Sequence, residues 1–174
     1  MADTLPYNLE LAKKITGITD EELLKFYIDA VLEKISSILG YNVVLSEYNH
    51  IINGVDKDYI YSLGRPLKEI LQITKDNNNI TNQCNIISDR KIGLGMHLCH
   101  QEEVLANYKA GYETLPSSIQ MFVFGQVKSM SSDLEFTNLK SYSIETISYS
   151  FMNKIDNNTD FLIQVNNLFG SSLW

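Results

Sequence analysis

The sequence is poor in the residues that most often carry catalysis or bind metals, with two cysteines and three histidines among 174 residues. Cys84 and Cys99 are too few for a disulfide framework, and a reducing cytoplasm would keep both as thiols. No apolar run approaches the roughly 20 residues that span a bilayer. The first residues also lack the basic and then apolar order of a secretory signal. We therefore expect a protein that stays in the cytoplasm where it is made, with no membrane contact.

Basic residues are also scarce: 14 Lys and Arg stand against 21 Asp and Glu, a formal net charge of −7. Proteins that grip nucleic-acid phosphates need clustered Lys and Arg, so this balance disfavours that class. It is compatible with ordinary solubility and with a surface that DNA passes without binding. A hydrophobic content of 44% and a charged content of 20% are typical of a globular chain and disfavour wholesale disorder.

One local cluster has side chains that bind metals: His97, Cys99 and His100, with Cys84 as a candidate fourth ligand. Zinc accepts all of these groups. However, the adjacent cysteine and histidine do not match the usual spacing of paired ligands, and the sequence has no second pair. We favour a polar loop beside a strand, and a metal site is the less favoured alternative.

Motifs for nucleophilic or nucleotide chemistry are missing from the sequence. No histidine stands beside a G-x-S-x-G turn, and the two glycines at 93–95 are too few for a phosphate-binding loop. The acidic pair at 21–22 is explained by helix capping and the helix dipole, and the pair at 102–103 by a solvated strand entry. We therefore expect no catalytic residue, no bound metal and no cofactor.

Two segments carry strong helical patterns. Thr19 and Glu22 fit a capping box, apolar residues then recur at helical spacing, and Gly40 supplies a stop, which together predict a helix over about 20–39. A shorter helix over 9–15 precedes it, capped by Asn8 and ended by Gly17. A further helix is predicted over about 116–132, because proline is tolerated in a first turn and an apolar stripe follows. We expect the two long helices to be core partners.

The middle of the chain, about 41–112, has repeated turn-forming residues between short runs of alternating polarity. The clearest predicted strand has four inward positions, and another places aromatic and aliphatic residues on one face: Val104, Ala106, Tyr108 and Ala110 in the first, Tyr59, Tyr61 and Leu63 in the second. Antiparallel hairpins forming a small sheet or open barrel are expected. The predicted fold is α+β: a small helical core with an inserted antiparallel β-rich subdomain, then a C-terminal extended arm and short helix.

The C-terminal part of the chain combines an alternating run, a polar linker and a final helix that begins at Thr159. We divide the chain into a domain over 1–151 and an arm over 152–174. The run over 141–151 has two apolar phases: Tyr142 and Ile144, then Ile147, Tyr149 and Phe151. The arm has a larger apolar set: Phe161, Leu162, Val165, Leu168, Phe169, Leu173 and Trp174. These side chains either fold back on their own domain or dock on another protein, where aromatic anchors dominate binding.

The order of these elements resembles the head–tail connector family of tailed bacteriophages, also called adaptor or head-completion proteins. Four segments carry the resemblance: 17–20 (G-I-T-D) before the first long helix, 63–70 (L-G-R-P-L-K-E-I), 108–116 (Y-K-A-G-Y-E-T-L-P) before the second, and the extended run 141–151. The most specific of the four is the stretch from A-G-Y to the proline at 110–116. Together they span about residues 17–151 in the order expected for the family.

The resemblance implies a non-enzymatic structural protein of the virion neck, made in the bacterial host cytoplasm. Its copies would form a ring, often a dodecamer, that binds the portal protein on one side and a stopper or tail-completion protein on the other. Genome DNA would pass through the channel without specific binding. The resemblance implies portal contact through residues 159–174, and the run over 142–151 is a candidate contact between subunits. The alternatives are another phage assembly protein (stopper or tail-completion) and, less favoured, a small metal-binding cytoplasmic protein.

Overall fold

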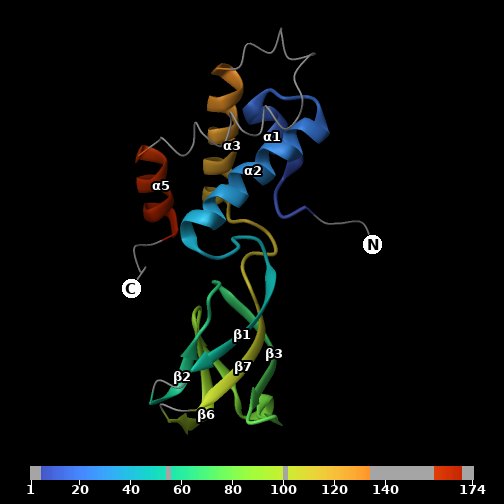
Figure 1. Cartoon of the computed structure of the whole chain (residues 1–174). Coiled ribbons are helices and arrows are strands. Elements are labelled where there is room, and N and C mark those ends of the chain that lie inside the picture. Colours follow the sequence, from blue (N-terminus) through green and yellow to red (C-terminus); the bar gives the residue numbers. More distant parts are fainter. Residues whose placement is uncertain (1–4, 54–55, 100–101, 134–158, 170–174) are drawn as a thin grey trace. The chain divides into compact units, whose positions relative to one another are not determined.

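A computed structural model describes residues 5–53, 56–99, 102–133 and 159–169 (Figure 1). The fold class is α+β, as predicted. Residues 39–113 form one compact unit, called here the β unit, and the flanking parts of the chain, 1–38 and 114–174, form the other, called the helical unit. The predicted antiparallel β-rich insertion between two long helices is therefore confirmed.

The helical unit contains four described helices: α1 (Leu9–Thr16), α2 (Glu21–Leu39), α3 (Ser117–Asp133) and α5 (Thr159–Phe169). The expected ends of α1 are confirmed. The Asn8 side chain accepts a hydrogen bond from the Leu11 N–H, and Gly17 ends the helix in the left-handed region with φ 78°. Both features are common forms of helix capping.

The start of α2 differs by one residue from the prediction. The Leu23 N–H donates to the Asp20 side chain at 3.0 Å, and the Leu24 N–H donates to the Asp20 carbonyl. Asp20 is therefore the N-cap, and the assignment of Thr19 was wrong. A carboxylate both accepts the hydrogen bond and complements the positive end of the helix dipole, so it outcompetes the neighbouring hydroxyl. Beyond the cap, the predicted apolar stripe is buried: Leu24, Ile28, Val31 and Ile35.

Helix α3 follows Pro116 as expected, and its stripe is buried at Ile119, Val123, Phe124, Val127 and Met130. The short α1 packs directly on α3. The two long helices α2 and α3 belong to the same unit, and their direct pairing as core partners stays a prediction. The Tyr7 ring meets the Phe124 ring edge-on at 6.3 Å. The Asn8 N–H donates to the Gln120 side chain at 3.0 Å. The segment before α2, whose sequence looks like a lead-in, is thus part of the core.

The β unit contains two sheets. The four-stranded sheet has the order β1-β7-β3-β4 and the three-stranded sheet the order β2-β6-β5, with antiparallel pairing throughout. The strands, with one 3₁₀ turn, are β1 (Ser46–Asn53), β2 (Lys57–Tyr61), β3 (Leu67–Lys75), β4 (Asn78–Asn79), η1 (Thr81–Gln83), β5 (Asn85–Ser88), β6 (Lys91–Leu98) and β7 (Glu103–Ala110). The expected antiparallel arrangement is confirmed.

Strand β7 lies between β1 and β3 and organises the core. Its four predicted inward residues, Val104, Ala106, Tyr108 and Ala110, are all fully buried. They join residues of the three-stranded sheet, including Ile60, Ile92, Leu94 and Leu98, in a single apolar cluster. Because strand side chains alternate between faces, burying one face of each sheet leaves the opposite face of each in solvent.

Candidate functional site

Two of the segments that carry the family resemblance meet inside the β unit. The Gly111 N–H donates to the Pro66 carbonyl at 2.9 Å, and Leu67 pairs with Ala110 in the β3–β7 ladder. The Arg65–Pro66 peptide bond is cis. Pro66 and Gly111 are 45 positions apart in the chain, so only long-range strand pairing brings the segments 63–70 and 108–116 together. We call this contact, with the residues that hold it, the junction.

Gly111 is required at the junction by its backbone. Its φ is 110°, and a Cβ there would lie 2.6 Å from the Val44 carbonyl oxygen. Next to it, the Tyr112 N–H donates to the Val43 carbonyl at 2.9 Å, and the Leu45 N–H donates to the Tyr112 carbonyl at 3.0 Å. The chain therefore enters and leaves the β unit along two hydrogen-bonded segments, and a side chain at 111 would force them apart.

Aromatic rings complete the junction. The Arg65 Nε–H donates to the Tyr41 hydroxyl at 2.9 Å, and its guanidinium lies 5.6 Å from the centre of that ring. The Tyr48 ring packs against Gly64, where a Cβ would come within 2.6 Å of it. Tyr48 also stacks on Tyr108, with ring centres 5.5 Å apart. Burial raises the pKa of Tyr108 to about 12, and its hydroxyl accepts the Leu63 N–H at 2.7 Å. These groups fix backbone geometry, and the raised pKa keeps the Tyr108 phenol neutral at physiological pH.

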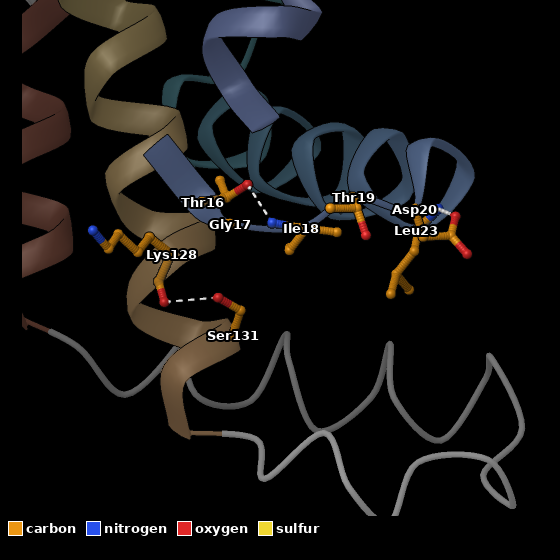
Figure 2. A pocket seen from close by; sticks show the side chains of 8 residues that line it. All are labelled: Thr16, Gly17, Ile18, Thr19, Asp20, Leu23, Lys128 and Ser131. Carbon is orange, nitrogen blue, oxygen red and sulfur yellow. Dashed lines mark hydrogen bonds between the residues drawn. The ribbon is translucent and has the colours of Figure 1, made fainter. Parts of the chain in front are cut away.

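In the helical unit, a cavity of about 510 Å³ lies beside the turn between α1 and α2 (Figure 2). It is lined by Thr16, Gly17, Ile18, Thr19, Asp20, Leu23, Lys128 and Ser131. Several of its polar groups form hydrogen bonds within the helices or at their ends. The Thr16 hydroxyl donates to the Ala12 carbonyl and accepts the Ile18 N–H, and the Ser131 hydroxyl donates to the Lys128 carbonyl. The cavity thus contains the G-I-T-D segment of the resemblance, and hydrogen bonds of helix ends account for much of its polarity.

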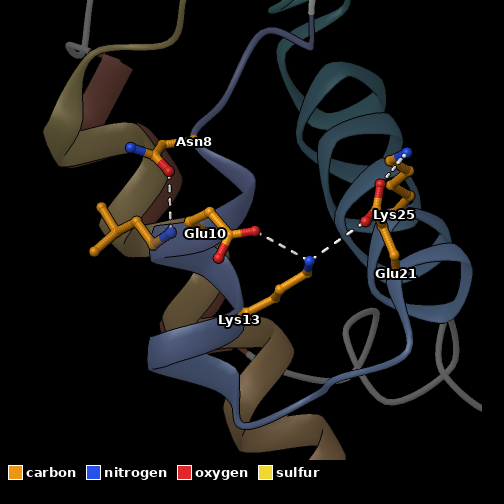
Figure 3. A network of polar contacts seen from close by, with 6 residues as sticks. Asn8, Glu10, Lys13, Glu21 and Lys25 are labelled. Atoms are coloured by element: carbon orange, nitrogen blue, oxygen red, sulfur yellow. Dashed lines mark hydrogen bonds and ion pairs between the residues drawn. The ribbon is translucent and has the colours of Figure 1, made fainter.

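An ion-pair network joins α1 to α2 on the surface of the helical unit (Figure 3). The Lys13 ammonium lies 3.1 Å from the Glu10 carboxylate and 3.3 Å from that of Glu21, which also pairs with Lys25 at 2.8 Å. Hydrogen bonds from Lys25 and then Lys13 lower the pKa of Glu21. These groups are solvent-exposed, so the network orients two helices and adds little stability.

The residues of the alternative metal site are engaged separately. The His97 Nε2 lies 2.9 Å from the Asp56 carboxylate. Cys84 is half-buried, its thiol donates to the Ile80 carbonyl at 3.3 Å, and burial raises its pKa, which disfavours the thiolate that a metal needs. Cys99 is exposed, and His100 lies outside the described residues. Within 5–53, 56–99, 102–133 and 159–169, no three His, Cys, Asp or Glu residues gather in a way that could hold a metal.

The residues of the predicted docking arm differ in burial. Phe161 and Val165 are buried, and the Phe161 ring stacks on Phe122 of α3 at 5.5 Å. These two residues fold back on their own unit, one of the two alternatives that the sequence leaves open. Leu162 is exposed, Leu168 and Phe169 are half-buried, and Leu173 and Trp174 lie outside the described residues. The candidate contact segment between subunits also lies outside them: Tyr142, Ile144, Ile147, Tyr149 and Phe151.

Sequence reasoning missed a basic and aromatic surface on the outer side of the three-stranded sheet. Lys91 lies between two rings, with its ammonium 4.8 Å from the centre of Tyr59 and 5.4 Å from that of Tyr61. The two rings meet edge-on at 5.4 Å, and Tyr61 is 46% exposed. We call this surface the basic face, formed by Lys57, Tyr59, Tyr61, Ile87, Arg90 and Lys91.

The geometry of the basic face follows from strand pairing. Tyr61 pairs with Lys91 and Tyr59 with Gly93 across the β2–β6 ladder. Gly93 leaves room for the neighbouring strand, since a Cβ there would meet the side chains of Asn85 and Ile87. Lys57 lies 5.2 Å from the centre of the Tyr59 ring, and the Arg90 guanidinium lies 5.9 Å from that of Tyr61. In the sequence, the basic face is visible only as the alternating run K-D-Y-I-Y at 57–61 and the R-K pair at 90–91. The β2–β6 register is what makes these two segments neighbours.

Within the described helices, none is long and apolar enough to cross a membrane. Comparison with known proteins finds no matching family model and no matching curated protein.

Proposed function

We propose that this chain is a structural protein of the neck of a tailed bacteriophage. In this proposal its copies form an adaptor ring that binds the portal protein on one side and a stopper or tail protein on the other. The ring leaves a channel for the genome. The function is geometric: self-association and docking, with no catalytic step and no cofactor.

The observation that carries the proposal is the junction. Two segments of the family resemblance, 63–70 and 108–116, lie far apart in the chain and are joined by the Gly111–Pro66 hydrogen bond, and the second contains the most specific of the four motifs. They belong to a β unit inserted between the two long helices, which is the arrangement that the resemblance implies. Gly111 allows the close approach of the two segments, the Pro66 carbonyl accepts its N–H, and Tyr112 forms backbone hydrogen bonds with Val43 and Leu45. Each of these residues therefore has a structural role at the junction.

Charge supports the same function. A net charge of −7 on each copy makes a ring of many copies strongly acidic. Phosphate binding releases counterions only where Lys and Arg cluster, so an acidic ring would let DNA pass without retaining it. Three of the basic side chains of the β unit, Lys57, Arg90 and Lys91, lie against aromatic rings in cation–π contacts.

The proposal is tested by deleting the gene in the phage that encodes it, with the wild-type gene supplied in trans as the control. We expect filled or leaking capsids and separate tails without the gene, and complete particles with it. Cryo-electron microscopy of complete particles should then show the chain as a ring at the neck. Finding it only at the distal tail, or recovering infectious particles that lack it, would contradict the proposal. A ring that touches the tail but not the portal would identify a stopper or tail-completion protein instead.

A further inference from the structure

The outer side of the four-stranded sheet is opposite in charge to the basic face. Register places Glu47, Lys109 and Glu69 in one cross-strand row, with Lys109 paired to Glu69 at 2.9 Å. Ile51 and Leu105 form another row with Thr74. We call this surface the acidic face, formed by Glu47, Ile51, Glu69, Asp76, Glu103 and Leu105. Its four carboxylates outnumber the ammonium of Lys109.

The acidic face has an apolar centre in a shallow cavity of about 340 Å³. Ile51 is 62% exposed and Leu105 is 42% exposed, and Asp76 and Glu103 lie at the rim of the same cavity. Lys75 lies nearby, but its ammonium is held by Glu102 at 2.8 Å. An apolar centre with a charged rim is the usual plan of a protein–protein contact.

The two faces lie on opposite sides of the β unit, because the two sheets bury their inner sides against the same apolar cluster. Among the described residues, each face exposes large apolar side chains: Ile51 and Leu105 on the acidic face, and Tyr61 and Ile87 on the basic face. Each face therefore offers an apolar centre and an excess of one sign of charge, and the two signs are complementary.

We propose that the acidic face of one copy binds the basic face of the next, so that copies of this chain associate head to tail. The inference rests on the proposed function, since it names the surfaces through which the ring closes. A contact between two different faces of identical chains is heterologous, and it generates a ring when the rotation between neighbours closes. Two identical patches would give only a dimer.

The occupant of the basic face is a second copy for two physical reasons. First, a nucleic acid presents phosphates along its whole length to a chain of net charge −7, whereas the acidic face of a second copy presents four carboxylates, one of them already paired with Lys109. Second, the face exposes aliphatic groups such as Ile87, which need an apolar partner, and Ile51 and Leu105 supply one. Complementary charge then adds register and faster association.

The test uses two variants of the full chain, each of which shortens exposed side chains on one face. Tyr61→Ala/Lys91→Ala alters the basic face, and Ile51→Ala/Leu105→Ala alters the acidic face. The matched control, Lys14→Ala/Met121→Ala, changes an exposed lysine and an exposed methionine outside the β unit and outside the C-terminal arm. Thermal unfolding confirms that all three are folded. Sedimentation velocity over a range of concentrations measures association.

We expect each face variant to associate at least about tenfold more weakly than wild type, the loss that corresponds to about 1.4 kcal/mol, and the control to be unchanged. A mixture of the two face variants should form one-to-one dimers and nothing larger, because each partner retains one intact face. This mixing result separates a head-to-tail contact from a symmetric one.

Wild-type association that neither variant weakens would overturn the pairing of faces while leaving the neck function in place. A wild-type chain that stays monomeric up to about 1 mM, the weak end of specific binding, would also overturn it. So would tight binding of a fluorescent single-stranded oligonucleotide that Tyr61→Ala/Lys91→Ala abolishes, since nucleic acid would then occupy the basic face. Absence of the chain from the particle neck, by contrast, would overturn the proposed function alone.

Discussion

At the scale of single residues, two glycines of this chain have opposite structural meanings. Gly111 sits at φ 110°, with the Val44 carbonyl oxygen 2.6 Å from where a Cβ would stand. Gly125 lies within α3 at an exposed position, and a Cβ there would meet nothing within 4 Å. The first residue is needed for conformation and close approach, whereas the second only weakens its helix.

We predict that Gly111→Ala lowers the free energy of unfolding of the β unit by at least about 2 kcal/mol, because backbone strain and overpacking each cost about 1–3 kcal/mol. Gly125→Ala should instead stabilise the helical unit by about 0.5–1 kcal/mol, the gain from replacing glycine within a helix. Differential scanning calorimetry of the full-length variants measures both changes. An unchanged Gly111→Ala variant would show that the junction is not held as described.

At the scale of elements, α5 shows how burial separates residues of one apolar helix. Phe161 is 1% exposed and stacks on Phe122, whereas Ile163, two positions on, is 52% exposed. Helical geometry sends neighbours two apart to different faces, so the same short helix has one packed face and one face in solvent. Burial of its aromatic anchor should therefore determine whether α5 stays on its unit.

We predict that Phe161→Ala destabilises the helical unit by about 3–5 kcal/mol, the cost of removing a buried phenylalanine from a packed site. Ile163→Ala serves as the control, and its effect should stay within about 0.5 kcal/mol because the side chain is exposed. Urea unfolding followed by circular dichroism measures both. Equal, small effects would mean that Phe161 does not pack on α3 and is available for another partner.

The elements also show which features a sequence can predict. The burial of the α2, α3 and β7 stripes was predicted, because a local period of 3.6 or 2 residues records which face is inside. The N-cap at Asp20 was missed by one residue, because Thr19 and Glu22 also fit a capping pattern. The two-residue β4 and the turn η1 (Thr81–Gln83) were missed because elements this short have no period to detect.

The candidate surfaces could not be predicted, because they depend on register between distant strands. Tyr61 and Lys91 are thirty positions apart and become neighbours only when β2 pairs with β6. Ile51 and Leu105 meet only when β1 pairs with β7. A single sequence contains the alternation of each strand but not the partner to which it pairs, so the charge and apolar content of a sheet face stay undefined until the topology is known.

At the scale of the whole molecule, the insertion of one unit into another has a physical consequence at the junction. The chain enters and leaves the β unit side by side, through the hydrogen bonds of Tyr112 with Val43 and Leu45. The unit has its own apolar cluster, so its core does not require the flanking helices. A domain that can fold alone typically has its own apolar core and chain ends that lie close together.

We predict that a fragment of residues 39–113 folds cooperatively, with a free energy of unfolding of at most about 3–5 kcal/mol, the range that a core of this size supplies. A shorter fragment, 46–110, keeps every strand but loses the hydrogen bonds of Tyr112 and the Gly111–Pro66 contact, so it should be markedly less stable. Amide dispersion in NMR spectra and urea unfolding compare the two. If both fragments are equally stable, the junction adds nothing to the fold. If neither folds, the β unit depends on the helices, and the insertion is not an independent domain.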